Sequence, residues 1–153
     1  MNLEELLKSV QDKWGRETVN AILKKIDEQD IKWDGTLRRS ISYEQAPDGN
    51  ITFLMADYGQ FQDQGVNGVS NNRQSPFSFR ISSIGGVAHF IKPWANSKGL
   101  NNWAVARSIV RKGIKPRPFF NDVIEARLNT LGLDIEQAMV QYMEDQIRKY
   151  NAQ

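Results

Sequence analysis

Two alternating segments flank a turn in Leu37-Arg-Arg-Ser-Ile-Ser-Tyr-Glu-Gln-Ala-Pro-Asp-Gly-Asn-Ile-Thr-Phe-Leu-Met-Ala56. Over residues 37–44 the odd positions Leu37, Arg39, Ile41 and Tyr43 alternate with polar even positions, which is the period of a half-buried strand. Residues 47–50 read Pro-Asp-Gly-Asn, which is strong turn chemistry, and residues 51–56 follow as a second, apolar strand. The pattern therefore predicts an antiparallel hairpin.

The segment before the hairpin has helical periodicity. Asn2 and Glu5 have the spacing of a capping box, in which each side chain accepts a hydrogen bond from the other residue's backbone. Apolar residues then recur at helical spacing as far as Ile26, with Gly15 as an interruption. We expect residues 2–29 to form one bent helix or two short helices.

The segment after the hairpin contains weaker signals. Residues 59–76 are rich in glycine, asparagine and glutamine and poor in apolar side chains, which predicts a long loop. Residues 77–82 alternate again and residues 87–91 are mostly apolar, so both segments are candidate strands.

Three signals predict helices in the last third of the chain. Asn102 suits the N-cap of a helix over residues 103–112, with a glycine directly after it. Pro118 suits the first position of another helix, which places residues 119–120 in its first turn. Asp134 suits the N-cap of a C-terminal helix. An N-terminal helix, a small antiparallel sheet built on a hairpin, a long loop and C-terminal helices together predict an α+β fold.

The length and composition limit the class of protein. A chain of 153 residues suits one domain, which we expect to span residues 1–153. It contains no cysteine, which excludes a disulfide framework and thiolate chemistry. No segment approaches the roughly 20 apolar residues of a membrane span, and the N-terminus lacks the basic region of a targeting signal. We therefore expect a soluble, unprocessed protein with no membrane partner.

The charges are unevenly distributed along the chain. Residues 1–63 carry 12 acids and 8 bases, and residues 122–153 carry 6 acids and 3 bases. Such asymmetry suggests that the middle of the chain meets an acidic partner or nucleic acid. The alternative is that it pairs with the acidic ends, within the chain or between subunits. The interval between Asp63 and Asp122 has no acid and nine bases, which are Arg73, Arg80, Lys92, Lys98, Arg107, Arg111, Lys112, Lys115 and Arg117.

Few residues are suited to catalysis or metal binding. His89 is the only histidine and no nucleophile motif accompanies it, so we interpret it as a structural residue. One histidine without cysteine does not make a zinc site. Asp57 and Asp63 form a carboxylate pair, but no pocket signature surrounds them. We expect neither enzyme activity nor a cofactor or metal.

The octet Gly113-Ile-Lys-Pro-Arg-Pro-Phe-Phe120, which we call the proline arm, contains two prolines. Each proline fixes its own φ and keeps the preceding residue out of the helical region. Lys115 and Arg117 are therefore expected on a stiff, extended segment. Taken alone, the arm is either a junction into a helix with both phenylalanines in the core, or an assembly device.

Three segments resemble, in order, motifs of bacteriophage tail-completion proteins, the neck family that joins tail to head. Asp34-Gly-Thr-Leu-Arg-Arg-Ser-Ile41 is similar to the family's T-G-x-L-R-x-S-I, with Asp34 in place of threonine. Ala56-Asp-Tyr-Gly-Gln-Phe-Gln-Asp-Gln-Gly65 is similar to Y-A-x-Y-x-E-x-G, with Gln62 or Asp63 where the family tends to have glutamate. Pro116-Arg-Pro-Phe-Phe120 is similar to P-R-P-F-L before a helix.

The resemblance covers roughly residues 1–65 and 113–130 and leaves 66–112 as a basic enlargement of a single tail-completion-like domain. It implies a non-enzymatic virion protein, assembled in the host cytoplasm, that forms a ring, expected to be hexameric. The ring would join the head connector or stopper to the tail tube or terminator and let DNA pass. A tail terminator or another minor tail protein is the alternative within this class.

The arm suits such a ring because contacts between ring subunits are heterologous and need complementary patches. We expect Arg117 to pair with Asp57 or Asp63 of the next subunit, beside aromatic anchors. The competing hypothesis is a DNA-binding module over residues 66–117, in which bases neutralise phosphates and aromatic faces stack on nucleobases. The expected interface residues are Lys115, Pro116, Arg117, Pro118, Phe119, Phe120, Asp57 and Asp63, and the expected DNA-facing residues are Arg73, Arg107, Arg111 and Lys112.

Overall fold

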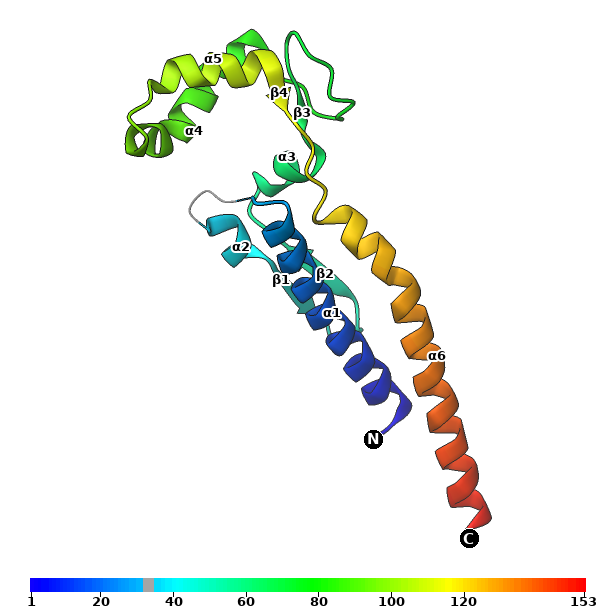
Figure 1. Ribbon diagram of the computed structural model, residues 1–153. Helices are drawn as coiled ribbons and strands as arrows, with labels where there is room; N and C mark the ends of the chain where they lie inside the picture. Colours follow the sequence, from blue (N-terminus) through cyan, green and yellow to red (C-terminus); the bar gives the residue numbers. More distant parts are fainter. Residues whose placement is uncertain (32–34) are drawn as a thin grey trace. The chain divides into compact units, whose positions relative to one another are not determined.

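A computed structural model describes residues 1–31 and 35–153, so position 34 of the first resemblance motif lies outside the described residues. The fold is α+β, with a long N-terminal helix, two small antiparallel sheets and a long C-terminal helix that packs on the N-terminal one (Figure 1). This confirms the predicted fold class. None of the described helices is long and apolar enough to cross a membrane.

The chain divides into two compact units. Unit 1 comprises residues 1–30, 38–55 and 119–153, and unit 2 comprises residues 31–37 and 56–118. Unit 1 contains both long helices and the predicted hairpin. Unit 2 contains most of the basic interval and the proline arm up to its second proline.

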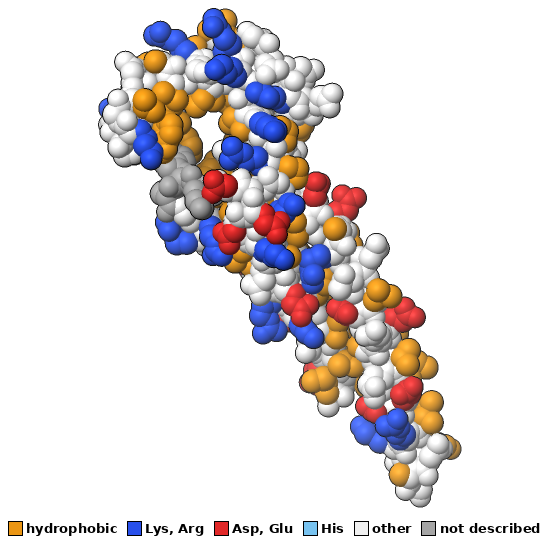
Figure 2. All heavy atoms as spheres, viewed as in Figure 1, with side chains coloured by type: hydrophobic (Ala, Val, Ile, Leu, Met, Phe, Trp, Pro, Cys, Tyr) orange, Lys and Arg blue, Asp and Glu red, His pale blue; other side chains and the backbone are white. Residues whose placement is uncertain are grey.

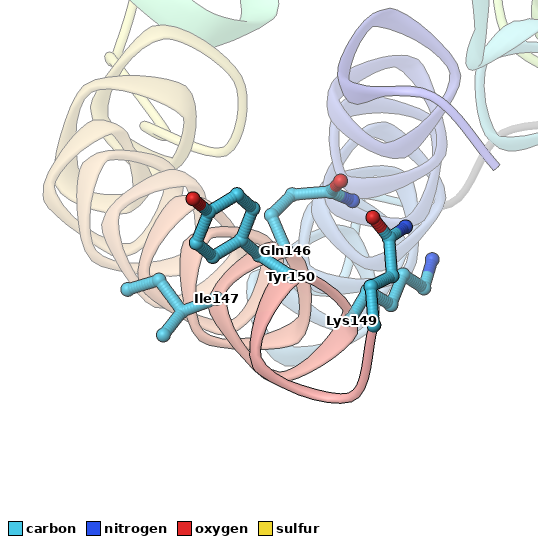
Figure 3. A pocket seen from close by; sticks show the side chains of 5 residues that line it. Gln146, Ile147, Lys149 and Tyr150 are labelled. Carbon is cyan, nitrogen blue, oxygen red and sulfur yellow. The ribbon is translucent and has the colours of Figure 1, made fainter.

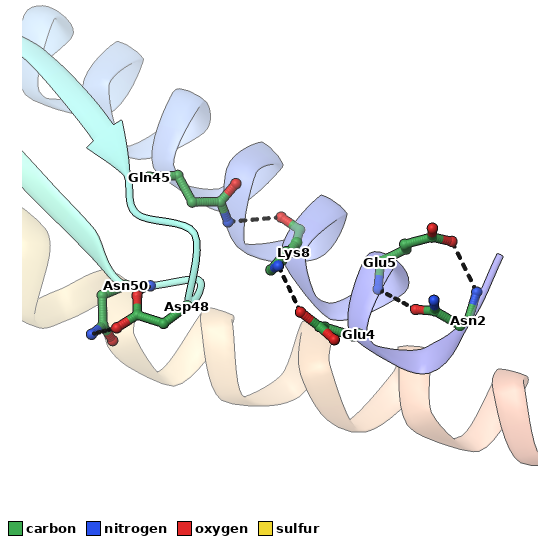
Figure 4. Close-up of polar contacts among 7 residues, drawn as sticks. All are labelled: Asn2, Glu4, Glu5, Lys8, Gln45, Asp48 and Asn50. Atoms are coloured by element: carbon green, nitrogen blue, oxygen red, sulfur yellow. Dashed lines mark hydrogen bonds and ion pairs between the residues drawn. The ribbon is translucent and has the colours of Figure 1, made fainter.

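In unit 1, α1 (Leu3–Glu28) is one continuous helix despite Gly15. A Cβ on Gly15 would lie 2.9 Å from the ring of Tyr43, so this glycine lets the hairpin approach the helix and does not interrupt it. The predicted capping box is confirmed (Figure 4): Oδ1 of Asn2 accepts from the Glu5 N–H at 2.8 Å, and Oε2 of Glu5 accepts from the Asn2 N–H at 3.0 Å.

The hairpin pairs β1 (Ser42–Gln45) with β2 (Ile51–Leu54) in antiparallel register, and the Gln45 side chain donates to the Lys8 carbonyl at 3.0 Å (Figure 4). The predicted strand is wrong over its first residues, because α2 (Thr36–Ser40) is a short helix. Leu37 and Ile41 are both buried. A spacing of four residues fits one face of a helix as well as it fits the even positions of a strand.

The C-terminal helix α6 (Asn121–Asn151) is continuous, so the predicted N-cap at Asp134 is wrong. The helix also begins after Pro118 and not at it, which leaves Phe119 and Phe120 outside its first turn. Half-buried side chains recur along one face on both sides of Asp134, and this packing face carries the helix through that position. The face includes Ile124, Leu131, Ile135, Ala138 and Tyr142.

The helix α6 runs antiparallel to α1 (Figure 1), and two hydrogen bonds join the two helices at Arg127. The Trp14 indole N–H donates to the Arg127 carbonyl at 2.8 Å, and the Arg127 guanidinium donates to the Thr18 hydroxyl at 2.9 Å. Trp14 and Thr18 are both buried, so each polar group has a partner where water is excluded.

Unit 2 begins with α3 (Gly59–Gln64) and β3 (Val66–Asn67), so the predicted long loop contains a short helix and a short strand. The strand predicted over residues 77–82 is wrong: the described backbone forms only an isolated bridge at Ser78, followed by the 3-10 turn η1 (Ile81–Ser83).

The strand predicted over residues 87–91 is also wrong, because this segment lies in α4 (Ile84–Ser97). Ala88 and Ile91 pack with Ala106 of α5 (Asn102–Lys112) in a small apolar core. Three-residue spacing of buried side chains is helical, and the two small alanines allow the helices to approach closely. The helix predicted over 103–112 is confirmed, but its N-cap is Asn101, one residue before the predicted one.

Candidate interface on the proline arm and the basic helix

The first part of the proline arm is built into unit 2. Its residues Gly113–Ile114 form β4, which pairs antiparallel with β3 so that Ile114 lies opposite Val66. Further along, the Arg117 N–H donates to the Gln62 carbonyl at 2.9 Å. The arm is therefore extended, as its prolines predict, and it is hydrogen-bonded to its own chain at both ends of this stretch.

Gly65 is the point at which the arm crosses the end of α3. It has φ of +71°, and a Cβ there would lie 2.5 Å from the Ile114 carbonyl oxygen and 2.7 Å from the ring of Pro116. Only glycine permits both this conformation and this close approach. The structure thus brings together the second and third resemblance motifs, which are separated by the whole basic interval in the sequence.

The side chains of the arm divide into exposed bases and buried apolar groups. Lys115 and Arg117 are exposed, whereas Pro116 and Pro118 are half-buried. Phe119 is 0% exposed and lies edge-on to the half-buried Phe120, with ring centroids 6.3 Å apart. Phe119 is therefore a core residue and offers no surface to a neighbour.

The two candidate acids differ in the same way. Asp57 is exposed. Asp63 is only 4% exposed and lies in α3, beneath the surface of its own unit. Of the expected interface residues, Lys115, Arg117 and Asp57 are thus the charged groups that a neighbouring molecule can reach.

The four candidate DNA-facing residues lie at one helix. Arg107, Arg111 and Lys112 are exposed on α5. Arg73 is distant in sequence, but its Nε donates to the Lys112 carbonyl at 3.1 Å, at the C-terminus of this helix. A guanidinium there satisfies a free carbonyl and interacts favourably with the helix dipole.

The loop that carries Arg73 is held by the amide side chain of Asn67, a residue that sequence analysis missed. Its Oδ1 accepts from the N–H groups of Arg73 at 2.7 Å and Ser75 at 3.1 Å, and its Nδ2 donates to the Ser75 carbonyl at 2.8 Å. An asparagine among many in a polar segment gives no signal of this role, because the hydrogen bonds span six to eight residues.

The basic interval is not neutralised within unit 2. None of its nine bases forms an ion pair with a described acid of the unit, and eight of them are exposed. Trp103 is 51% exposed and lies in line with Arg107 and Arg111 at successive four-residue steps along α5. Figure 2 shows Lys and Arg side chains gathered over the segment that carries α5, whereas both signs are interspersed over α1 and α6.

The described groups with shifted pKa values all belong to unit 1. The Tyr43 hydroxyl donates to Oδ1 of Asp12 at 2.9 Å, and this hydrogen bond, with burial and the negative charge of Asp12, raises the pKa of Tyr43. Hydrogen bonding to Lys8 lowers the pKa of Glu4, and hydrogen bonding to Asp27 raises the pKa of Arg38. All three are local surface or half-buried pairs.

No feature of the described residues resembles an enclosed reaction site. Two shallow depressions lie along α6, and Figure 3 shows the one at its C-terminal end, lined by Gln146, Ile147, Lys149 and Tyr150. His89 is exposed on α4 and lines neither of them. The described His, Asp and Glu side chains form no cluster of three or more that could hold a metal ion.

A scan of protein-family models and searches of curated proteins and solved structures gave no match to this chain. The fold and the site together describe an α+β protein with a hydrogen-bonded, extended basic arm and a basic helix whose bases form no ion pair with a described acid.

Proposed function

We propose that this chain is a non-enzymatic structural protein of the phage neck, a tail-completion protein that forms a ring, expected to be hexameric, between head connector and tail tube. One observation carries the proposal. Gln62 and Gly65 of the second resemblance motif contact Arg117 and Pro116 of the third. The two motifs therefore form a single structural element, which accounts for their occurring together.

The geometry of this element suits a ring contact. The backbone of the arm is held by β3 and by Gln62, so presenting Lys115 and Arg117 to a neighbour costs little conformational entropy. A heterologous contact needs a different, complementary patch on the next subunit. Asp57 is the exposed acid that meets this requirement, since Asp63 is buried.

Charge reversal tests the arm directly. Arg117→Glu should abolish joining of purified tails to filled heads and the infectivity that depends on it, whereas Lys98→Glu should leave both unchanged. Lys98 makes the matched control because it is equally exposed and directly follows α4. Combining Arg117→Glu with Asp57→Arg should restore joining. If tails that carry the Arg117→Glu variant join to heads normally, the arm is not the assembly device.

The position of the protein in the particle separates the tail-completion role from that of a tail terminator or another minor tail protein. A tail-completion ring lies directly against the head connector or stopper. A terminator lies at the end of the tail tube, so the neighbours seen in the assembled neck decide between them.

A second candidate function is DNA binding by unit 2, favoured by the exposed and unpaired bases of α5 and by Trp103 in line with them. Phosphate neutralisation by such bases supplies affinity without sequence readout. A stacking indole adds contacts to single strands. In a neck ring the same surface would face the DNA that passes through it.

Salt dependence tests this second function. Duplex affinity measured by fluorescence anisotropy should fall linearly on a log–log plot against salt, with a slope of about 0.9 for each neutralised phosphate. Arg107→Gln and Arg111→Gln should each reduce the slope by about 1, and Arg148→Gln in unit 1 should not. Absence of measurable binding at low salt would remove the DNA-binding function and leave the arm's role intact.

A further inference from the structure

The C-terminal half of α6 carries a row of exposed apolar side chains, which we call the outer stripe. Its members are 41–79% exposed, and Figure 2 shows hydrophobic side chains along this edge of the helix. Contiguous exposed apolar surface on a soluble domain marks an interaction site. The outer stripe consists of Leu133, Met139, Val140, Met143, Ile147 and Tyr150.

The stripe lies on the side of α6 that faces away from α1. Leu131, Ile135, Ala138 and Tyr142 are half-buried along the packing face. At 100° per residue the stripe is centred about 130° round the helix from them, with Leu133, Val140 and Ile147 nearly opposite. Figure 3 shows the Ile147 side chain projecting from the left of the helix end, whereas the α1 ribbon lies to its right.

The last turns of α6 also extend past the helix that supports it. Trp14 of α1 bonds to Arg127 of α6 in antiparallel register, so the first residue of α1 lies level with about residue 140 of α6. Figure 1 shows α6 continuing beyond that end. The side chains of these last turns therefore lie largely exposed, beyond the reach of the helix that packs on the rest of α6.

The spacing of the stripe identifies the kind of partner. Leu133, Val140 and Ile147 recur every seven residues, and so do Met143 and Tyr150, with Glu136 one heptad before them. This is the spacing of a short coiled-coil seam, about two and a half heptads long. We propose that the outer stripe pairs with the same stripe of a second copy of this chain, with the two helices antiparallel.

An antiparallel pair has one register that places every seam residue against another. With the two-fold axis between residues 141 and 142, Leu133 meets Tyr150 of the second copy, and Val140 meets Met143 of the second copy. Glu136 then lies opposite Ile147. Each layer therefore pairs a residue of the series that begins at Leu133 with a residue of the series that begins at Glu136, as in an antiparallel coiled coil.

The charges favour this orientation over a parallel one. Parallel helices would place the two Glu136 carboxylates against each other in the seam, and like charges at that distance repel. In the antiparallel pair they are about 11 residues, or roughly 16 Å, apart along the axis. Glu136 instead lies beside the turn of the second copy that carries Arg148, whose ion pair among the described residues, with Asp145, is a long exposed contact of 4.0 Å.

The pair would be isologous, since the same surface is used twice, and it closes with two copies. It does not rest on the neck function, which uses the arm and a heterologous contact. One seam of about 26 Å is small beside a standard interface, so we expect a weak dimer with a dissociation constant roughly in the micromolar to millimolar range.

Sedimentation equilibrium of the full chain tests the dimer and its orientation together. Wild type should pass from monomer to dimer as concentration rises, and Val140→Asp should remain monomeric with unchanged helical circular dichroism. Ile147→Lys should dimerise about tenfold more tightly than Ile147→Glu, because residue 147 faces Glu136 of the other copy. A wild type that is monomeric up to about 1 mM overturns the proposal.

Crosslinking provides a test that does not depend on affinity, because the chain has no cysteine of its own. An oxidised mixture of Leu133→Cys and Tyr150→Cys chains should form disulfide-linked pairs, whereas either variant alone should not, since its two thiols are about 25 Å apart. Ser9→Cys on exposed α1 is the control for random collision. Rapid linking of either single variant with itself would mean parallel helices and overturn the proposed orientation.

Discussion

The two units of the chain use charge in opposite ways. Unit 1 contains 15 acids and 10 bases, a balance of −5, whereas unit 2 contains 3 acids and 10 bases, a balance of +7. In unit 1, pairs such as Glu4 with Lys8 and Glu17 with Arg127 hold charges together within the chain. In unit 2, the bases of the basic interval form no such pairs with the described acids. The difference is that unit 1 pairs many of its charges within the chain, whereas the bases of the basic interval in unit 2 form no ion pair with a described acid.

The largest effect on stability is expected at Phe119, the first residue of the proline arm that belongs to unit 1. Phe119→Ala removes a fully buried aromatic ring and should lower the free energy of unfolding by about 3–5 kcal/mol, measured by urea denaturation. Phe90→Ala, at a half-exposed ring in unit 2, should cost far less. Similar losses at both sites would contradict the assignment of Phe119 to the core.

The next largest effect is expected from glycine substitutions, which should change stability in opposite directions in the two units. Gly113→Ala places a Cβ at φ of +77° and within 2.3 Å of the Val66 carbonyl oxygen, so it should destabilise unit 2 by at least about 1–3 kcal/mol. Gly132→Ala meets no atom within 4 Å in the middle of α6 and should stabilise the protein by about 0.5–1 kcal/mol. Thermal denaturation of both variants checks the contrast, and a stabilising Gly113→Ala would refute the close pairing of β3 and β4.

The loop that carries Arg73 depends on one side chain in unit 2. Asn67→Ala removes the amide that bonds to Arg73 and Ser75 and should cost about 1–3 kcal/mol. Asn71→Ala on the exposed tip of the same loop is the control. Hydrogen exchange should show loss of protection over residues 71–78 in the first variant alone, and equal protection in both would remove Asn67 from this role.

The smallest effect is expected at the half-buried hydroxyl of Tyr43 in unit 1. Tyr43→Phe should cost about 0.5–1.5 kcal/mol at neutral pH, because it removes the hydrogen bond to Asp12. The pKa of Tyr43 is raised in the folded state, so its contribution is complete below the unfolded pKa near 10 and is lost as the pH rises through the folded value. The stability difference between wild type and variant should therefore shrink above about pH 10. An unchanged difference there would contradict the pairing.

Local signals in the sequence predicted the features that depend on neighbouring residues. The capping box at Asn2 and Glu5, the turn at 47–50 and the glycine that closes α5 are each determined within a few residues. The wrong predictions lie where packing decides between the periodicity of a helix and that of a strand. Leu37 with Ile41, and Ala88 with Ile91, form helical faces only because other elements cover them.

The candidate site was predictable in part for the same reason. The prolines restrict the arm to an extended backbone whatever surrounds it, so the conformation at Lys115 and Arg117 followed from the sequence. The burial of Phe119 and Asp63 did not, because it depends on segments distant in the chain. The outer stripe of α6 had a readable seven-residue repeat, but only the position of α1 distinguishes it from the packing face.

The central claim is that the basic arm of unit 2 joins this protein to its neighbours in the phage neck. Cryo-EM of virions assembled with this chain tests it most directly, because the reconstruction locates every copy and its contacts. The account predicts a ring between head connector and tail tube, with Arg117 of each subunit against Asp57 of the next. Density for the chain outside the neck and tail, or a ring whose arms face solvent, would contradict it.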